Sequence, residues 1–399
     1  MDLTDLPFAA GSETRAARAP VPLDGPRAPR AALRQTRRAF VRLAAGGAAG
    51  LVLACGPGSP PPADPAPAAP AVPPTSAPVA AAPTVGRVPD VVRRGTLRGI
   101  SFGAVIARER GYFAELGIDD QETVFSSGAE MTQALAAGQI EIGATSNTSA
   151  FYNALARGLW QPFVLDIWHL ERGDQSYMVV VRPDLVDQIR QVTDLRGRIA
   201  ANSSPVRDGG NSVVKKLFDT VGMALDDVQW ERLAYSDMLA ALGNRAVEAG
   251  VVIEPYVTLG KQRGVLTPWI ALGDYDPGYQ LAGLVFSESF IKDRNEVARR
   301  WSVGYVRGLR DQHALATRGK DRDVLAPILA AHTGLAVDVV DQVGWGPVHP
   351  DGRLNLDSVL ESQRQLVEWG TISQTLPLEQ LVDPQFSDYA VQQLGPYQA

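Results

Sequence analysis

The sequence predicts an α/β protein with two similar lobes, each built on a mainly parallel sheet, joined by two crossover segments. Three observations support this fold class. Short apolar runs alternate with amphipathic segments from residue 95 onward, and strands separated by single helices form parallel β-α-β units. The order of these runs occurs twice at a constant spacing. The patterned region is about 300 residues long, which exceeds the usual size of one hydrophobic core.

The repeat is clearest in two ungapped segments that lie 107 residues apart (237 − 130). EMTQALAAGQIEIGATSN spans residues 130–147, and DMLAALGNRAVEAGVVIE spans residues 237–254. Acidic, Met, Ala, Leu and Gly positions recur in register, but the first copy ends on Asn147 and the second on Glu254. Ligands of open α/β sheets bind at the carboxyl ends of the strands. We therefore expect the equivalent ends of the two copies to face one cleft.

The expected elements follow the same order in both copies, so the duplication covers a whole β-α-β-α-β block. In the first copy we expect strands at residues 96–103, 121–127 and 140–145, with helices at residues 104–116 and 128–138. In the second copy we expect strands at residues 197–202, 228–234 and 247–253, with helices at residues 211–223 and 236–244. Glycines near the helix ends act as C-terminal stops.

An export signal is expected over residues 1–54. The run TRRAFVR at residues 36–42 places Arg37, Arg38 and Phe40 in the twin-arginine pattern, and a short apolar run rich in Gly and Ala follows it. A run of about 12 residues is too short for a membrane-spanning helix, which needs about 20, but it suits the core of a signal peptide. We therefore expect export through the twin-arginine machinery.

Cys55 is the only cysteine of the chain, and it directly follows the residues VLA. This arrangement resembles a bacterial lipobox, whose cysteine receives a lipid, although Leu53 is larger than the residue usual at its position. An unmodified cysteine is the alternative. We expect a lipid anchor at Cys55, which would hold the protein on the periplasmic or outer face of the cytoplasmic membrane.

A disordered tether is expected over residues 55–94. Its first part is almost entirely Pro, Ala, Gly and Ser, with eleven of the 29 prolines of the chain and no aromatic residue. Such a composition cannot bury enough apolar surface to offset the entropy of ordering. Proline-rich chains favour the extended polyproline II conformation, which rises about 3.1 Å per residue. The tether could therefore hold a folded part several tens of Å from a membrane.

Charge and motifs exclude several classes of function. After the signal, the chain has 30 basic and 40 acidic residues, which argues against a nucleic-acid surface. His313, His332 and His349 are scattered without metal-ligand spacing, and the sequence contains no H-E-x-x-H or C-x-x-C motif. We therefore expect a protein without a metal, a cofactor or catalytic activity.

Six segments carry a resemblance to a known family. They are ARERGYFAELGI, VFSSGAEMTQALAAGQIEIGATS, NALARG, DLRGRIAA, DMLAALGNRAVEAGVVIEPY and LVFSESFIKDRNEVARRWSVGYVRGLRD. Their order resembles that of solute-binding proteins of ABC importers in the nitrate, sulfonate, taurine and thiamine-pyrimidine-precursor group, which have the periplasmic-binding-protein type II fold. The resemblance covers residues 95–315.

The resemblance implies a division of the folded part into lobes. The runs YMVVVRPD at residues 177–184 and QLAGLVFSES at residues 280–289 look like the two crossings between lobes in that family. Residues 95–180 and 283–399 would then form lobe I, and residues 181–282 would form lobe II.

The resemblance also implies a mechanism. The lobes would close around a small organic ligand, sulfonate- or pyrimidine-like, and a monomer would deliver it to an ABC permease. A ligand-sensing subunit for a membrane signalling partner is the alternative. The related pyrimidine-synthesising enzymes share the fold, but their cysteine-rich signature is missing here.

Candidate ligand contacts in lobe I lie at strand ends and helix starts. Helix N-termini there would favour an anionic or strongly accepting group, although plain helix capping by the serines is the alternative. A polar and aromatic stretch follows the next strand, and its histidine could equally be a satisfied structural group. The candidates are Phe102, Gly103, Ser126, Ser127, Ser146, Asn147, Thr148, Asp166, Trp168 and His169.

Candidate contacts in lobe II lie in the loop NSSPVRDGGNS and at the end of the second copy. The two glycines of the loop permit close backbone approach, and the loop could enclose an oxyanion, although its aspartate opposes one. Glu254 suits a cationic or N–H donor group, or else caps a turn before Pro255, and its neighbour Tyr256 could stack or pack. The candidates are Asn202, Asp208, Gly209, Gly210, Asn211, Ser212, Glu254 and Tyr256.

Overall fold

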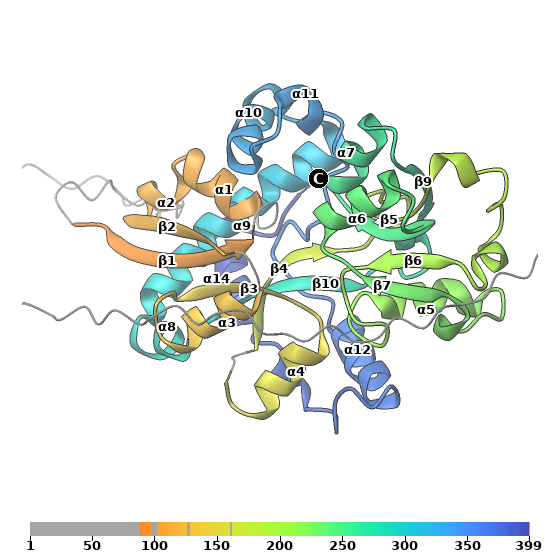
Figure 1. Cartoon of the computed structure of the whole chain (residues 1–399). Helices are drawn as coiled ribbons and strands as arrows, with labels where there is room; N and C mark the ends of the chain where they lie inside the picture. Colours follow the sequence, from red (N-terminus) through yellow and green to blue (C-terminus); the bar gives the residue numbers. More distant parts are fainter. Residues whose placement is uncertain (1–87, 98–101, 126–127, 160–161, 399) are drawn as a thin grey trace, which may run out of the picture. The chain divides into compact units, whose positions relative to one another are not determined.

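The computed structural model describes residues 88–97, 102–125, 128–159 and 162–398, which belong to one compact unit (Figure 1). The expected export motif, Cys55 and the candidate residues Ser126 and Ser127 lie outside these ranges. Within them, no helix combines the length and the apolar character that crossing a membrane requires.

The described residues contain two five-stranded sheets. The first sheet has the strand order β2-β1-β3-β10-β4 and the second has the order β7-β6-β8-β5-β9. We call the part around the first sheet the first lobe, and residues 177–271, which hold the second sheet, the second lobe. The strands are β1 Asp90–Leu97, β2 Ile118–Phe125, β3 Ile142–Ser146, β4 Phe163–His169, β5 Tyr177–Val181, β6 Ile199–Asn202, β7 Gln229–Arg232, β8 Ala249–Ile253, β9 Thr267–Ala271 and β10 Gln280–Phe286.

Each sheet is mainly parallel, as expected, and contains one strand that runs in the opposite direction to the other four. In the first sheet β1 pairs in parallel with β2 and β3, whereas β10 is antiparallel to both β3 and β4. In the second sheet β6 pairs in parallel with β7 and β8, whereas β5 is antiparallel to both β8 and β9. The antiparallel partners β5 and β10 are the two strands expected at the crossings. The second sheet therefore begins at residue 177 and the first sheet resumes at residue 280, slightly before the boundaries expected at 181 and 283.

The sequence repeat is also a repeat of structure. Helix α3 (Gly128–Ala136) and helix α6 (Tyr235–Gly243) begin 107 residues apart (235 − 128), as do β3 and β8 (249 − 142). Both pairs also have equal lengths. The corresponding strands occupy the same position in the two sheet orders. The expectation of two similar lobes is therefore confirmed at the level of single elements.

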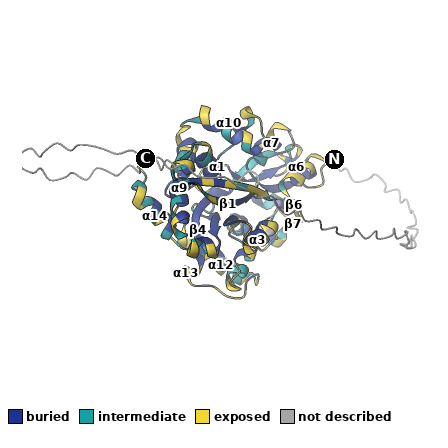
Figure 2. Cartoon of the chain, turned by 90° about the vertical axis from the view of Figure 1, so that its left-hand side faces the viewer, coloured by how far each residue is buried: buried dark blue, intermediate teal, exposed yellow. Residues whose placement is uncertain are grey.

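Helices surround both sheets, and the strands lie in the interior (Figures 1 and 2). Buried side chains form a large core in the first lobe and smaller cores on the two faces of the second sheet. The remaining helices are α1 Phe102–Glu109, α2 Tyr112–Glu115, α4 Ser149–Ala156, α5 Asn211–Asp219, α7 Tyr256–Gln262, α8 Glu288–Asp293, α9 Asn295–Arg318, α10 Arg322–Thr333, α11 Val337–Val340, α12 Leu356–Glu368, α13 Leu378–Leu381 and α14 Gln385–Leu394.

The first strand begins earlier than the sequence suggests. β1 starts at Asp90, within the segment expected to be a tether, and includes Arg94, whose side chain is fully buried. Arg94 forms ion pairs with Asp120 at 2.9 Å and with Glu122 at 3.0 Å. A buried charged residue whose ion-pair partners lie on the neighbouring strand interrupts the apolar pattern. The sequence pattern therefore does not reveal the start of β1.

The helix expected at residues 104–116 is two helices. Gly111 lies between α1 and α2 with a φ of 77°, a left-handed conformation that glycine adopts without steric cost. The first of these helices begins at Phe102, so Phe102 and Gly103 start a helix instead of ending a strand.

The C-terminal segment, residues 319–398, contacts both lobes. Lys216 on α5 of the second lobe pairs with Glu361 on α12 at 2.8 Å. Elsewhere on the second lobe, Thr258 Oγ1 donates a hydrogen bond to the carbonyl of Gln342 at 3.3 Å. Figure 1 shows α10 and α11 on one side of the sheets and α12 on the other. The segment therefore holds the second lobe at two separate places.

Candidate functional site

A cavity of about 420 Å³ lies between the two lobes. This volume is within the range of small-molecule sites, about 300–1,000 Å³. The first lobe lines it with the ends of β1 and β3, the starts of α3 and α4, and part of β4. The second lobe lines it with the loop after β6, the start of α6 and the end of β8. The repeated elements thus bring their equivalent ends to one shared space.

The described lining of this cavity is uncharged. It has no Lys, Arg, Asp, Glu or His among the residues that the structure describes. Hydroxyl groups come from Thr132, Thr145, Ser146, Thr148, Ser203 and Ser204, and aromatic rings come from Trp168, Tyr177 and Tyr235. Such a lining offers apolar surface, ring stacking and hydrogen bonds without a fixed counter-charge.

Four predicted residues line the cavity: Ser146, Thr148, Trp168 and Gly210. Gly210 is required there for space, because a Cβ atom at this position would lie 2.5 Å from the hydroxyl of Tyr177. A glycine of the predicted loop thus permits the close approach at the cavity wall.

Three polar side chains of the loop, those of Asn202, Asn211 and Ser212, bond within it. Asn202 Nδ2 donates to Asn211 Oδ1 at 2.5 Å, and Asn211 Nδ2 donates to the carbonyl of Pro205 at 2.7 Å. Ser212 Oγ donates to the carbonyl of Gly209 at 2.9 Å. These bonds fix the shape of the loop, and none of these polar side chains lines the cavity.

Asn147 is not placed to hold a ligand, which corrects the expectation for this residue. Its side chain is 1% exposed. Nδ2 donates to the carbonyl of Gln280 at 3.1 Å and to Ser362 Oγ at 2.8 Å, while Oδ1 accepts from the hydroxyl of Tyr152 at 2.5 Å. The Nδ2 end of the amide therefore joins the end of β3 to β10 and to α12, and the Oδ1 end joins it to α4.

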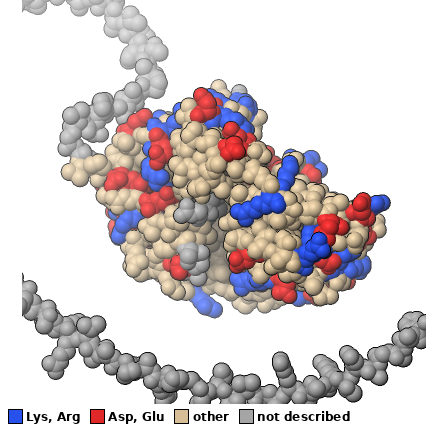
Figure 3. All heavy atoms as spheres, turned by 45° about the horizontal axis from the view of Figure 1, so that its top comes forward, with Lys and Arg blue, Asp and Glu red and all other residues tan. Residues whose placement is uncertain are grey.

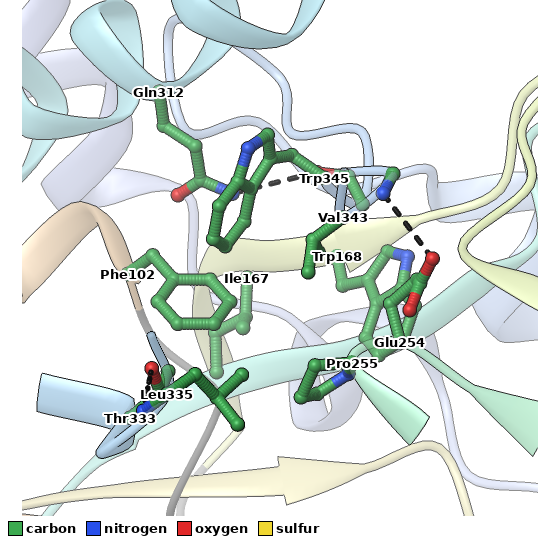
Figure 4. A pocket seen from close by; sticks show the side chains of 12 residues that line it. Phe102, Ile167, Trp168, Glu254, Pro255, Gln312, Thr333, Leu335, Val343 and Trp345 are labelled. Atoms are coloured by element: carbon green, nitrogen blue, oxygen red, sulfur yellow. Dashed lines mark hydrogen bonds between the residues drawn. The ribbon is translucent and has the colours of Figure 1, made fainter. Parts of the chain in front are cut away.

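Glu254 lines a small apolar pocket beside the main cavity, together with Phe102 and Trp168 (Figure 4). Its carboxylate accepts hydrogen bonds from the backbone and hydroxyl of Thr258, at 3.0 and 2.8 Å, and from the backbone of Gly344 at 3.3 Å. Burial raises the pKa of Glu254, although these hydrogen bonds act in the opposite direction. The carboxylate thus joins the second lobe to the C-terminal segment instead of lining the main cavity.

Aromatic rings line the small pocket. Phe102 contacts Trp345 edge-on, with ring centroids 5.0 Å apart, and Figure 4 shows both rings beside Trp168. Because Trp168 lines both hollows, it forms the wall between the main cavity and the small pocket. Tyr256 does not line either hollow but stacks on Tyr235, with centroids 5.5 Å apart.

Asp166 and His169 form a polar network behind the cavity wall. Asp166 is fully buried and accepts from Gln280 Nε2 at 2.6 Å and from the backbone of His349 at 2.7 Å. His169 contacts the carboxylates of Asp166 and Glu171, each at 3.1 Å. Burial alone would lower the pKa of His169, but these carboxylates outweigh it and raise the pKa to about 10. Neither residue lines the cavity, so the expectation of ligand contact gives way to a structural role.

Gly103 also has a packing role. A Cβ atom at this position would lie 2.7 Å from Leu309 Cδ2 on α9. The glycine therefore allows α1 to approach α9, and it does not line the cavity.

Several lining residues were not predicted, among them Tyr177, Tyr235, Ser203 and Ser204. The repeat contains a signal for Tyr235, because it begins α6 at the position where Gly128 begins α3, and both line the cavity. The two serines belong to the loop that the sequence analysis selected, although it favoured other residues in it. Tyr177 has no comparable signal, because it lies at the crossing and reads as part of a buried strand.

Figure 3 shows acidic and basic side chains interspersed on the face in view. No group of three or more His, Cys, Asp or Glu residues in the described ranges could hold a metal ion.

Two lobes with mixed sheets and a shared cavity define the class of periplasmic-binding-protein-like clamps. The family comparison is more specific, because the model of the "NMT1/THI5 like" family matches residues 101–314. This match covers more than half of the chain. The protein therefore belongs to the NMT1/THI5-like family, as the six sequence segments indicated. A search of curated proteins found no match.

Solved structures with the same fold include binding proteins and an enzyme. The ligand-binding component of an ABC-type import system from Staphylococcus aureus, with zinc bound, has a TM-score of 0.62 at 15% identity and covers 75% of this chain and 99% of that chain. The periplasmic aliphatic sulphonate-binding protein SsuA from Escherichia coli has a TM-score of 0.57 at 19% identity and covers 74% and 93%. The desulfurization enzyme DSZB has a TM-score of 0.52 at 15% identity and covers 76% and 99%. At these identities the likeness concerns the fold.

Proposed function

We propose that this protein is an extracytoplasmic solute-binding lipoprotein of an ABC importer. It closes its two lobes around a small organic molecule and delivers that molecule to a permease in the cytoplasmic membrane. The observation that carries this proposal is the cavity of about 420 Å³ that both lobes line with equivalent strand ends. Membership of the family and the likeness to ABC-import binding proteins support it.

Hinge closure provides the mechanism. The two crossings, at residues 170–176 and 272–279, are the places where the lobes rotate relative to each other, as in other clamps of this kind. A solute that touches rings and hydroxyls of both lobes binds the closed state better than the open state. Its binding energy therefore shifts the population towards the closed state, and a shift from 1:99 to 99:1 needs about 5.5 kcal/mol of preference. The permease then recognises the closed form.

The anchor and the tether complete the proposal. After export by the twin-arginine machinery, a lipid on Cys55 holds the chain at the membrane, and the proline-rich segment after it gives the clamp reach. We propose that the chain acts as a monomer and without catalytic chemistry.

A thermal-shift screen of organic sulfonates and pyrimidines tests the binding function. A solute at 100 times its Kd adds about 2.7 kcal/mol to the free energy of unfolding. Each hit is then repeated with Tyr235→Ala, which removes a ring from the cavity, and with Tyr389→Ala on α14, away from the cavity lining, as the matched control. We expect the stabilisation to disappear only in the first variant. If every hit still stabilises the Tyr235→Ala variant, the solutes do not bind in this cavity.

Uptake measurements distinguish transport from sensing. In cells that lack the protein, uptake of the identified solute should fall and should return with the wild-type gene but not with Tyr235→Ala. A solute that binds and changes the distance between the lobes, but whose uptake does not depend on the protein, would instead favour the sensing alternative.

A further inference from the structure

A carboxylate of the second lobe occupies the start of a helix in the first lobe. Asp208 Oδ1 accepts a hydrogen bond from the backbone N–H of Ser149 at 2.6 Å, and another from the backbone of Gly209 at 2.9 Å. Ser149 is the first residue of α4, and the N-cap residue Thr148 makes no side-chain hydrogen bond to the helix. The capping group of α4 thus comes from the opposite lobe.

The contact lies directly against the main cavity. Thr148 and Ala150, on either side of Ser149, line the cavity, as does Gly210 near Asp208. Asp208 itself is 7% exposed. In addition, a Cβ atom at Gly209 would lie 2.9 Å from Thr148 Cγ2, so the loop and the helix start are in close contact. Asp208 does not itself line the cavity, so its carboxylate acts on a solute from behind the wall that these neighbours form.

The start of a helix attracts negative charge, because its first N–H groups are unpaired and the helix dipole places partial positive charge there. At α4 Asp208 accepts from one of these N–H groups, that of Ser149, and brings its own negative charge to the helix start. Among the described residues Asp208 has no ion-pair partner, and none of the described lining residues carries a positive charge. A second negative charge in the cavity would therefore be repelled by this carboxylate, whereas an uncharged solute would be tolerated.

We propose that Asp208 is a specificity-determining residue that makes the cavity select uncharged, ring-containing solutes over organic anions such as sulfonates. The three rings Trp168, Tyr177 and Tyr235 provide the surface for the solute ring, and the serine and threonine hydroxyls bind its polar groups. This inference rests on the proposed function and names the substrate class of the same site.

A matched pair of probes tests the inference. Benzenesulfonamide and benzenesulfonate have nearly the same shape, but only the second is negatively charged at neutral pH. Their affinities for the full-length protein are measured by calorimetric titration at low ionic strength, because salt screens the interaction. The variants are Asp208→Asn, which keeps an oxygen for Ser149 and removes the charge, and Asp187→Asn as the control. Asp187 is a highly exposed residue of the second lobe, so the control changes the net charge equally.

In the wild type we expect benzenesulfonamide to bind at least tenfold more tightly than benzenesulfonate. In Asp208→Asn the affinity for benzenesulfonate should rise at least tenfold, with little change for the sulfonamide, and Asp187→Asn should behave as the wild type. A second variant, Ser149→Pro, removes the N–H donor at a helix position that tolerates proline but keeps the charge, so it should not improve sulfonate binding. Thermal unfolding of each variant checks that it is folded.

Two results would overturn the inference. The first is tighter binding of benzenesulfonate than of benzenesulfonamide by the wild type, and the second is unchanged sulfonate binding in a folded Asp208→Asn variant. Either result leaves the proposed function intact, because the cavity would still bind a solute. The proposed function fails separately, if solutes that bind the cavity produce no change in the distance between the lobes.

Discussion

The backbone of Gly344 donates a hydrogen bond at 3.3 Å to the carboxylate of Glu254, and this bond joins the C-terminal segment to the second lobe. Thr258 contributes two further hydrogen bonds to the same carboxylate. Glu254, which ends the second copy of the repeat, therefore holds the C-terminal segment against the second lobe.

Replacement of Glu254 is expected to affect stability. In Glu254→Ala, three donors lose their acceptor at a partly buried position, so the free energy of unfolding should fall by about 1–3 kcal/mol. Glu254→Gln keeps the amide oxygen as an acceptor and should cost less than half as much. Urea denaturation of the two variants measures the difference. An alanine variant as stable as the wild type would show that these hydrogen bonds do not stabilise the fold.

The pH dependence of stability should report on His169. The pKa of His169 is raised from 6.5 to about 10, so protonation of this residue stabilises the folded state. The stabilisation is complete below pH 6.5 and is lost as the pH rises through about 10. The shift corresponds to at most about 5 kcal/mol. Denaturation between pH 6 and 10 should therefore show a falling free energy of unfolding.

The variant His169→Gln should flatten this pH dependence, because it removes the titrating group that Asp166 and Glu171 hold protonated. His313→Gln is the control, because the hydrogen bond of His313 goes to the backbone carbonyl of Val348. If the slope survives in His169→Gln, another group is responsible for it.

The buried ion pair of Arg94 should dominate the stability of the first lobe. Arg94→Met leaves Asp120 buried without its cation, which costs about 3–5 kcal/mol when one partner of a buried pair is removed. Arg196→Met removes an even closer partner of Asp227 on the surface, at 2.6 Å, and should cost about 0–1 kcal/mol. Chemical denaturation compares the two. Equal losses would refute the idea that burial makes the Arg94 pair important.

Cell fractionation tests the anchor. Cys55→Ser should move the protein from the membrane fraction to the soluble extracytoplasmic fraction, because the lipid has no attachment site. Replacement of both Arg37 and Arg38 by lysine should instead retain the chain in the cytoplasm. A Cys55→Ser protein that stays with the membrane would rule out anchoring through this residue.

Local pattern and repetition made much of the fold predictable. The helices α3 and α6 and the strands β3 and β8 were expected close to their observed bounds, because each has a clear apolar pattern and a copy 107 residues away. The start of β1 was not expected, because the neutralising partners of Arg94 lie on another strand. The antiparallel strands β5 and β10 could not be oriented from their own residues, since their direction follows from the crossings.

The site was predictable only in part, for a physical reason. Ser146, Thr148, Trp168 and Gly210 line the cavity because they lie at strand and helix ends, which the sequence reveals. The partners of other candidates come from distant parts of the chain.

Asn147 and Asp208 illustrate the difficulty. Asn147 bonds with Ser362 on α12, and Asp208 bonds with Ser149 on the opposite lobe. The sequence does not distinguish a polar side chain at a strand end that binds a solute from one that forms hydrogen bonds with distant parts of the chain.

The constant spacing of the two copies gives the molecule an internal reference. For a residue at the end of β3 there is a counterpart 107 positions later at the end of β8, in an equivalent sheet position. Where two such counterparts differ, as Asn147 and Glu254 do, one half of the chain has a role that the other half lacks. Residues could therefore be exchanged between the halves, with the untouched half serving as the standard for backbone geometry.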